Sequence, residues 1–221
     1  MLKNKIAAIH QPDFLSYLGF FKKMSNSDLF IYLDDVEISK GGVTNRDRIK
    51  TIKGQEWITV DLKKFKKKEL IKNIEISYDN DWSQRSLNLI EENYTKSKYY
   101  DQIFPIISEI FSFKPKYLIE FNIRSIDIIK RELNIKNKST FSSKFVLKEK
   151  KSSMLVEILK KNDIKNYLSG IGAKNYLDLN LFKKNNIKVL WNNFEHPIYD
   201  QQFDGFTKNL SIIDYLFNCG V

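Results

Sequence analysis

The sequence has little cysteine, histidine and arginine and no long apolar run, and each shortage excludes a class of protein. A single cysteine, Cys219, excludes a disulfide framework and any zinc finger. No stretch approaches the roughly 20 apolar residues that a membrane-spanning helix needs. The basic start MLKNKIAAIHQPDF turns polar after about four apolar residues, too few for a signal peptide. We therefore expect a cytoplasmic protein.

Because arginine is scarce, the strong positive charge does not by itself indicate nucleic-acid binding. The net charge is +10, but only five of the 37 basic residues are arginine. Lysine is a solvated point charge and lacks the bidentate contacts that arginine makes with phosphate. The lysine runs at residues 63–68 and 148–151 are therefore interpreted as exposed turns, and no nucleic-acid partner is predicted. The charge instead favours an acidic partner or a phosphorylated small molecule.

The chain does contain enough apolar material for a core. Hydrophobic residues make up 42% of the 221 residues and aromatic residues 14%, which is typical of a globular protein. We expect a single domain over residues 1–221.

Short apolar runs alternate with helical patterns along the chain. Strands are predicted at residues 6–9, 29–33, 72–78, 140–146, 165–170 and 187–194, with a hairpin over 51–62 that turns at Lys53-Gly54. Helices are predicted at residues 17–26, 81–99, 102–112, 116–133 and 178–186, after a cap at Ser152 or Ser153, and from Ser211, where S-I-I-D forms a capping box. This order predicts an α/β fold with a three-layer, mostly parallel sheet, a β-hairpin and a helical insert at about residues 80–135.

Polar residues follow several of the predicted strands. His10 and Gln11 follow the first strand, which ends there because Pro12 has no N–H to donate. The residues that follow the other strands are Asp34 with Asp35, Ser169 with Gly170, and His196. Because parallel strands end at one edge, we expect His10 and His196 to lie on the order of 10 Å from a common cleft. Two histidines beside carboxylates suit general acid–base chemistry; the alternative is that His10 only hydrogen-bonds a neighbouring turn.

Three further features bear on the chemistry. GGVTNRDRIK (41–50) carries Asn45, Arg46 and Lys50 and is interpreted as a loop that grips a phosphate or a carboxylate. Cys219 is a nucleophile only if a neighbouring base lowers its pKa, and we favour an inert residue. Metal ligation by His10, Asp34 and His196 lacks a spacing signature, so no metal site is predicted.

Six blocks of the sequence together resemble the WbqC-like family. They are IHQPDFLSYLGFFKKM, DLFIYLDDVEISK, NRDRIK, YLSGIGAKNYLD, NNFEHPIYDQ and NLSIIDYLFNCG, and they occur in the family's order. The sequence departs from the family's usual pattern at Ser16 and Glu37. The resemblance implies an α/β protein of bacterial surface-polysaccharide (O-antigen) biosynthesis that transfers an acyl or aminoacyl group, such as glycyl, to a sugar. It also implies a site built around His10 with Asp34, Asp35, Arg46, His196 and Asn209.

The leading hypothesis is an acyl- or aminoacyltransferase that acts on a nucleotide-linked amino sugar. His10 or His196 would take the proton of the amine, and Gln11 or Asn209 would stabilise the oxyanion. The donor would be an acyl thioester on an acidic carrier protein or coenzyme A, with no tightly bound cofactor. The candidate catalytic residues are His10, Gln11, Asp34, His196 and Cys219, and the candidate substrate-binding residues are Asp35, Asn45, Arg46, Lys50, Ser169, Gly170, Tyr199 and Asn209. The alternatives are a nucleotidyltransferase-like enzyme and a non-catalytic protein that binds a sugar or a carrier protein.

Overall fold

The computed structural model describes residues 5–39 and 41–221, which divide into two compact units. The first unit comprises residues 5–11, Phe21–Asp35 and Ile135–Glu195, and the second comprises Pro12–Phe20, Val36–Asn134 and His196–Val221. The short helix α1 (Leu18–Ser25) contains one of the points at which the chain passes from one unit to the other. The expected single domain over residues 1–221 stays a prediction.

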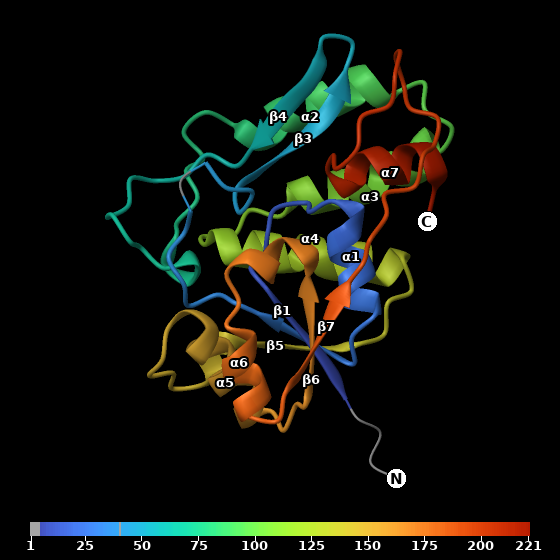
Figure 1. Ribbon diagram of the computed structural model, residues 1–221. Helices are drawn as coiled ribbons and strands as arrows, with labels where there is room; N and C mark the ends of the chain where they lie inside the picture. Colours follow the sequence, from blue (N-terminus) through green and yellow to red (C-terminus); the bar gives the residue numbers. More distant parts are fainter. Residues whose placement is uncertain (1–4, 40) are drawn as a thin grey trace. The chain divides into compact units, whose positions relative to one another are not determined.

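Five parallel strands form the sheet of the first unit (Figure 1). In spatial order they are β5 (Lys138–Phe141), β2 (Leu29–Tyr32), β1 (Ile6–His10), β6 (Asn166–Gly170) and β7 (Lys188–Asn192). The two central strands β1 and β2 are continuous apolar runs, as expected when both faces of a sheet are covered. The predicted α/β class with a mostly parallel sheet is confirmed.

One face of this sheet carries the core of the first unit. Alternate strand residues, such as Ile9 and Ile31, pack with residues from α5 (Lys151–Lys161) and α6 (Leu179–Lys184). Tyr167 of β6 stacks on Phe182 of α6, with 5.5 Å between the ring centroids. Because side chains alternate along a strand, the next residue after Ile9, His10, projects from the opposite face.

The second unit combines a hairpin with helices. Its elements are β3 (Arg46–Thr51), β4 (Gly54–Thr59), α2 (Trp82–Tyr94), α3 (Tyr100–Ser112), α4 (Leu118–Glu132) and α7 (Ile212–Cys219). Helix α2 contacts both strands of the hairpin, and α3 contacts α2, α4 and α7. A buried cluster of Phe14, Trp82, Phe111 and Phe121 holds the helices together, with ring centroids 5.2–6.4 Å apart. The predicted helical insert is therefore confirmed.

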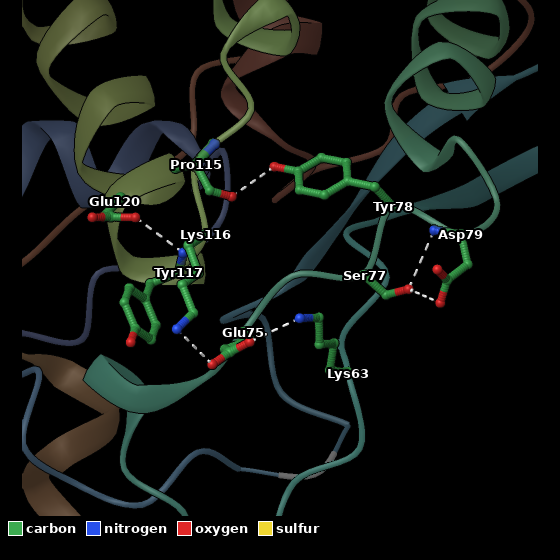
Figure 2. Close-up of polar contacts among 9 residues, drawn as sticks. All are labelled: Lys63, Glu75, Ser77, Tyr78, Asp79, Pro115, Lys116, Tyr117 and Glu120. Carbon is green, nitrogen blue, oxygen red and sulfur yellow. Dashed lines mark hydrogen bonds and ion pairs between the residues drawn. The ribbon is translucent and has the colours of Figure 1, made fainter.

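The predicted strand at residues 72–78 is wrong. The segment forms a 3-10 turn, η1 (Ile71–Asn73), followed by isolated bridges rather than a ladder. Its alternation is real, since Ile74 and Ile76 are buried, but no continuous strand lies beside it among the described residues. Figure 2 shows how side chains hold the segment instead: Glu75 accepts from Lys63 at 2.9 Å and pairs with Lys116 at 3.1 Å.

Two other strand boundaries also differ from the prediction. The strand expected at residues 140–146 ends at Phe141, where η2 (Ser142–Lys144) begins. The hairpin does turn at Lys53, but its first strand starts at Arg46. Part of the expected ligand-gripping loop is therefore a strand, because its residues pair along β4.

One predicted helix cap is confirmed and two are not. Ser211 caps α7 through its side chain, which accepts from the N–H of Ile213 at 3.4 Å. The expected capping box is wrong, because the carboxylate of Asp214 binds other side chains. Neither Ser152 nor Ser153 is a cap: the N-cap of α5 is Lys150, so both serines lie inside the helix. The Ser152 hydroxyl instead accepts from the N–H of Asp178 at 3.1 Å.

Candidate functional site

The order of the strands marks one place on the first unit's sheet. Strands β2 and β5 lie on one side of β1, and strands β6 and β7 lie on its other side. The order therefore reverses between β1 and β6, and in open parallel sheets ligands bind beyond the strand ends at such a switch point. Ala8 pairs with Leu168, so extending this register places His10 level with Gly170. His10 and Gly170 thus flank the switch point.

The His10 imidazole is held in its neutral form. Its Nδ1 lies 3.0 Å from the carbonyl oxygen of Gln11. A carbonyl only accepts, so Nδ1 carries the hydrogen and Nε2 carries the lone pair. Burial and the nearby Lys23 ammonium lower the pKa of His10 to about 3. Lys23 is itself buried, and its Nζ donates to the carbonyl oxygen of Ile9 at 3.4 Å.

The backbone at the end of β6 is open to the approach of a ligand. A Cβ atom added to Gly170 or to Gly172 would meet no heavy atom of the described residues within 4 Å. Ser169 differs, because it is 2% exposed and lies on the same strand face as Tyr167. Gly170 is therefore the more accessible of the two predicted binding residues.

Asp34 and Asp35 bind the turn that follows β5. The buried Asp34 carboxylate accepts from the Ser142 hydroxyl at 3.0 Å, from the Ser143 N–H at 2.9 Å and from the Ser143 hydroxyl at 2.6 Å. Asp35 accepts from the Ser142 hydroxyl as well. These bonds join the ends of β2 and β5, so both carboxylates stabilise the edge of the sheet. Their predicted roles in catalysis and substrate binding stay predictions.

Three predicted site residues of the second unit, Lys50, Tyr199 and Cys219, lie near the carboxylate of Asp214, a residue predicted only as part of a helix cap. Asp214 is fully buried and accepts from the Tyr94 hydroxyl at 2.8 Å, from the Tyr199 hydroxyl at 2.8 Å and from Gln201 Nε2 at 2.6 Å. Burial raises the pKa of Asp214 above its usual value, against the hydrogen bonds from Tyr199, Tyr94 and Gln201 and the smaller effect of the Lys50 ammonium.

Lys50 and Tyr199 fix the segment that precedes α7. The Lys50 ammonium donates to the carbonyl oxygens of Phe203 (3.2 Å) and Gly205. Burial and the Asp214 carboxylate raise the pKa of Tyr199 well above that of a free tyrosine. Tyr199 therefore stays protonated and keeps its hydrogen bond to Asp214. Both residues hold the chain in place, and their predicted binding roles are not tested by these contacts.

Cys219 is a thiol at neutral pH in this structure. It is partly buried, and burial together with the Asp214 carboxylate raises its pKa, against a smaller opposing effect of Lys98. A catalytic cysteine needs the reverse shift. This shift runs against a nucleophilic Cys219, and its role stays a prediction.

His196 belongs to an aromatic cluster of the second unit. Its ring lies 5.9 Å from that of Tyr199 and 5.7 Å from that of Phe206. Its Nδ1 lies 2.9 Å from the carbonyl oxygen of Pro197, so Nδ1 donates and Nε2 carries the lone pair when the ring is neutral. His196 is in the second unit and His10 in the first, and their expected common cleft stays a prediction.

The other predicted binding residues of the second unit have separate positions. Asn45 Nδ2 donates to the carbonyl oxygen of Val60 at 3.1 Å, so it extends the hairpin. Arg46 lies over the indole of Trp57, 4.2 Å from the ring centroid. Asn209 is exposed in a left-handed conformation with φ 59°, just before the capped start of α7.

Several residues on which these sites depend are not predicted from the sequence to be site residues. They are Lys23, Trp57, Tyr94, Ser142, Ser143, Gln201 and Asp214. Each acts through a partner far away in the sequence, such as Asp214 with Tyr94, and helix or strand periodicity carries no signal for such pairs. Within residues 5–39 and 41–221, no three His, Cys, Asp or Glu side chains converge to hold a metal ion. None of the helices described has the length and apolarity to cross a bilayer.

The fold defines an α/β protein whose parallel sheet has its topological switch point at His10. The family model of the "WbqC-like protein family" matches residues 11–221, so the chain belongs to this family. It is also 29% identical over 219 residues to "Uncharacterized protein Rv1507c" of Mycobacterium tuberculosis (strain ATCC 25618 / H37Rv), covering 98% of this chain and 94% of that protein. No solved structure matches the chain.

Proposed function

We propose that the protein transfers an acyl or aminoacyl group, such as glycyl, to the amine of a nucleotide-linked amino sugar in bacterial surface-polysaccharide biosynthesis. The observation that carries the proposal is the neutral His10 at the switch point of the sheet. Switch points of doubly wound sheets bind nucleotides, and a neutral imidazole is able to take a proton. The reaction would take place in the cytoplasm.

The reaction requires one base and one oxyanion donor. The amine of the sugar attacks the carbonyl carbon of an acyl thioester, and the negative charge moves to the carbonyl oxygen. His10 Nε2 takes the proton that the amine loses, and the Gln11 amide donates to the oxyanion. Collapse of the intermediate expels the thiolate, which receives that proton. The products are an amide on the sugar and a free thiol, so no oxidant or metal is required.

The low proton affinity of His10 is compatible with a base that works only on a bound substrate. A negative charge within a few ångströms stabilises the imidazolium, so an anionic nucleotide-linked sugar would raise the pKa of His10 towards the working range. The positive charge of Lys23 would at the same time attract that anion. In the absence of substrate the His10 imidazole would remain neutral.

Nucleotidyl transfer is the second candidate, because the switch point also suits a nucleoside triphosphate. In that reaction His10 would have to be positively charged to stabilise the phosphoryl transition state. A bound triphosphate would raise the pKa of His10 just as an anionic sugar would, so the assay below, and not the charge of His10 in the free protein, separates the two reactions. The donor of the acyl group would be an acidic carrier protein or coenzyme A, which suits the net charge of +10.

The experiment is an incubation with nucleotide-linked amino sugars and acyl or glycyl thioesters, followed by mass spectrometry. We expect a sugar product heavier by one acyl group. His10→Ala should abolish it and leave the melting temperature nearly unchanged. Lys188→Ala, at the exposed opposite end of β7, is the matched control and should keep full turnover. In a parallel incubation with a nucleoside triphosphate and a sugar phosphate, release of pyrophosphate would support nucleotidyl transfer. Binding without turnover would support a recognition protein, and either result contradicts the proposal.

A further inference from the structure

The second unit has a pocket that none of the predicted site residues line. It lies between strand β4 and helix α2 and has a volume of about 170 Å³. Its polar and aromatic lining consists of Trp57, Thr59, Asp61, Trp82, Arg85 and Ser86, and Ile58 and Leu89 complete the lining. Trp82, Arg85 and Ser86 are three and four residues apart on α2, so one face of the helix presents them together.

The size of the pocket limits what it holds. Sites for drug-sized ligands have volumes of roughly 300–1,000 Å³. A pocket of about 170 Å³ therefore suits a single ring or a short chain, and not a whole nucleotide.

The lining combines flat apolar surfaces with both kinds of hydrogen-bonding group. The Trp57 side chain is 43% exposed although it is a large aromatic residue. Asp61 and Arg85 form an ion pair at 2.9 Å, and each remains partly exposed. Asp61 and Arg85 offer an acceptor and a donor side by side, and the part of the Trp57 indole that Arg46 does not cover offers an apolar surface. A pyranose ring has the matching pattern, because its hydroxyls donate and accept and its C–H groups form an apolar face.

Trp82 supplies an independent reason to expect a ligand. Its side chain is 1% exposed, and its Nε1–H is buried with no hydrogen-bond partner among the described residues. Buried donors in native proteins are nearly always satisfied, so an unsatisfied one requires an explanation. A hydroxyl oxygen of a bound sugar would supply the acceptor.

Two arginines beside the pocket indicate an anionic group on the ligand. The guanidinium carbons of Arg46 and Arg48 lie 4.2 Å and 5.4 Å from the centroid of the Trp57 ring. Within the described chain, neither arginine forms an ion pair with a carboxylate. Arg46 donates to the carbonyl oxygen of Gly41 and Arg48 to Gln55, and the Nε atoms of both remain without a partner. A phosphate is the anion that arginine pairs best recognise.

We propose that the pocket between β4 and α2 binds the ring of a hexose phosphate, with the ring against Trp57 and the phosphate at Arg46 and Arg48. A fatty acyl chain fits less well, because Asp61, Arg85 and Thr59 make part of the lining polar. A bare phosphate fits less well too, because Asp61 is part of the lining. The proposal concerns binding by the second unit alone and does not rest on the transfer reaction proposed above.

The three tryptophans of the chain provide the readout. Trp191 is in the first unit, so in a Trp191→Phe background all indole fluorescence comes from Trp57 and Trp82. The probes are glucose, galactose and mannose 1-phosphates and N-acetylglucosamine 1-phosphate, with glucose and inorganic phosphate for comparison. We expect a saturable fluorescence change with at least one hexose 1-phosphate. Trp57→Ala should weaken its binding tenfold or more, whereas inorganic phosphate alone should bind far more weakly.

A charge comparison separates ring from phosphate recognition. The double variant Arg46→Gln, Arg48→Gln should weaken hexose 1-phosphate about tenfold and leave the weak binding of free glucose unchanged. Arg131→Gln removes the same kind of charge from α4 and should change neither. In the unmodified protein, the ligand should shift the indole N–H signals of Trp57 and Trp82 in an NMR spectrum but not that of Trp191. The proposal is overturned if no hexose 1-phosphate binds, if inorganic phosphate binds equally well, or if only the Trp191 signal shifts.

Discussion

Asp47 provides a quantitative test of the second unit's electrostatics. It lies on β3, is 5% exposed, and accepts from the N–H of Arg48 at 2.8 Å. Burial raises the pKa of its carboxyl from 3.8 to about 7; the hydrogen bond and the charge of Arg48 oppose this, and Asp13 adds to it. The folded protein therefore holds a proton on Asp47 at pH values at which the unfolded chain has lost it.

The sign and size of the effect follow from this difference. Below pH 3.8 both states are protonated and Asp47 contributes no pH dependence. As the pH rises towards about 7, the unfolded state loses its proton first, so the free energy of unfolding falls. At about 1.36 kcal/mol for each pH unit, the full loss above pH 7 is about 4 kcal/mol. Between pH 5 and pH 8 it amounts to about 2–3 kcal/mol.

Asp47→Asn removes this titration with little change in shape. Urea unfolding of the wild type and the variant at pH 5 and pH 8 gives the difference in unfolding free energy at each pH. His10 contributes an opposite slope between its folded pKa of about 3 and 6.5, but this slope is common to both proteins and cancels. We expect the variant to gain about 2–3 kcal/mol relative to the wild type from pH 5 to pH 8. A difference that does not change with pH would refute the assigned environment of Asp47.

Three other variants test separate contacts. Tyr94→Phe removes a donor from the buried Asp214 and should lower the unfolding free energy by about 1–3 kcal/mol in urea unfolding, whereas a loss near zero would contradict the network. Cys219→Ser should keep turnover within about a hundredfold of the wild type. In the wild-type protein, the Cys219 thiol should react with iodoacetamide more slowly at neutral pH than a free cysteine. Gly220 has φ 82° and an added Cβ would lie 3.0 Å from the Tyr99 ring, so Gly220→Ala should cost about 1–3 kcal/mol; an unchanged melting temperature would disprove the strain.

The sequence predicts those parts of the fold that depend on local patterns. The apolar runs at β1, β2, β6 and β7 give strands because sheets select such runs wherever both faces are covered. The cap at Ser211 is predicted for the same kind of reason, since a cap involves neighbours two or three residues away. The segment at residues 72–78 shows the limit. It alternates as a strand does, but a strand also needs a partner, and the partner is absent from the local sequence.

The sequence predicts candidate site residues only where they follow the end of a predicted strand. His10 and Gly170 were found because a strand's end is visible in the sequence, and parallel order then brings the two level. Asp214 was assigned to a cap because S-I-I-D has the right spacing. Its actual partners, Tyr94 and Tyr199, are set by how α2 and the segment before α7 pack, and no short motif encodes that packing.

The pairing of β2 with β5 has a consequence for how the chain folds. Tyr32 lies beside Phe141, so this single parallel contact closes a loop of 109 positions (141 − 32). Closing a flexible loop of that length costs about 4 kcal/mol before any sheet contact forms. Residues 36–134, which belong to the second unit, make up most of the loop, and their early collapse would shorten it. We therefore expect slow refolding, with protection of α2–α4 amides from hydrogen exchange appearing before that of β5.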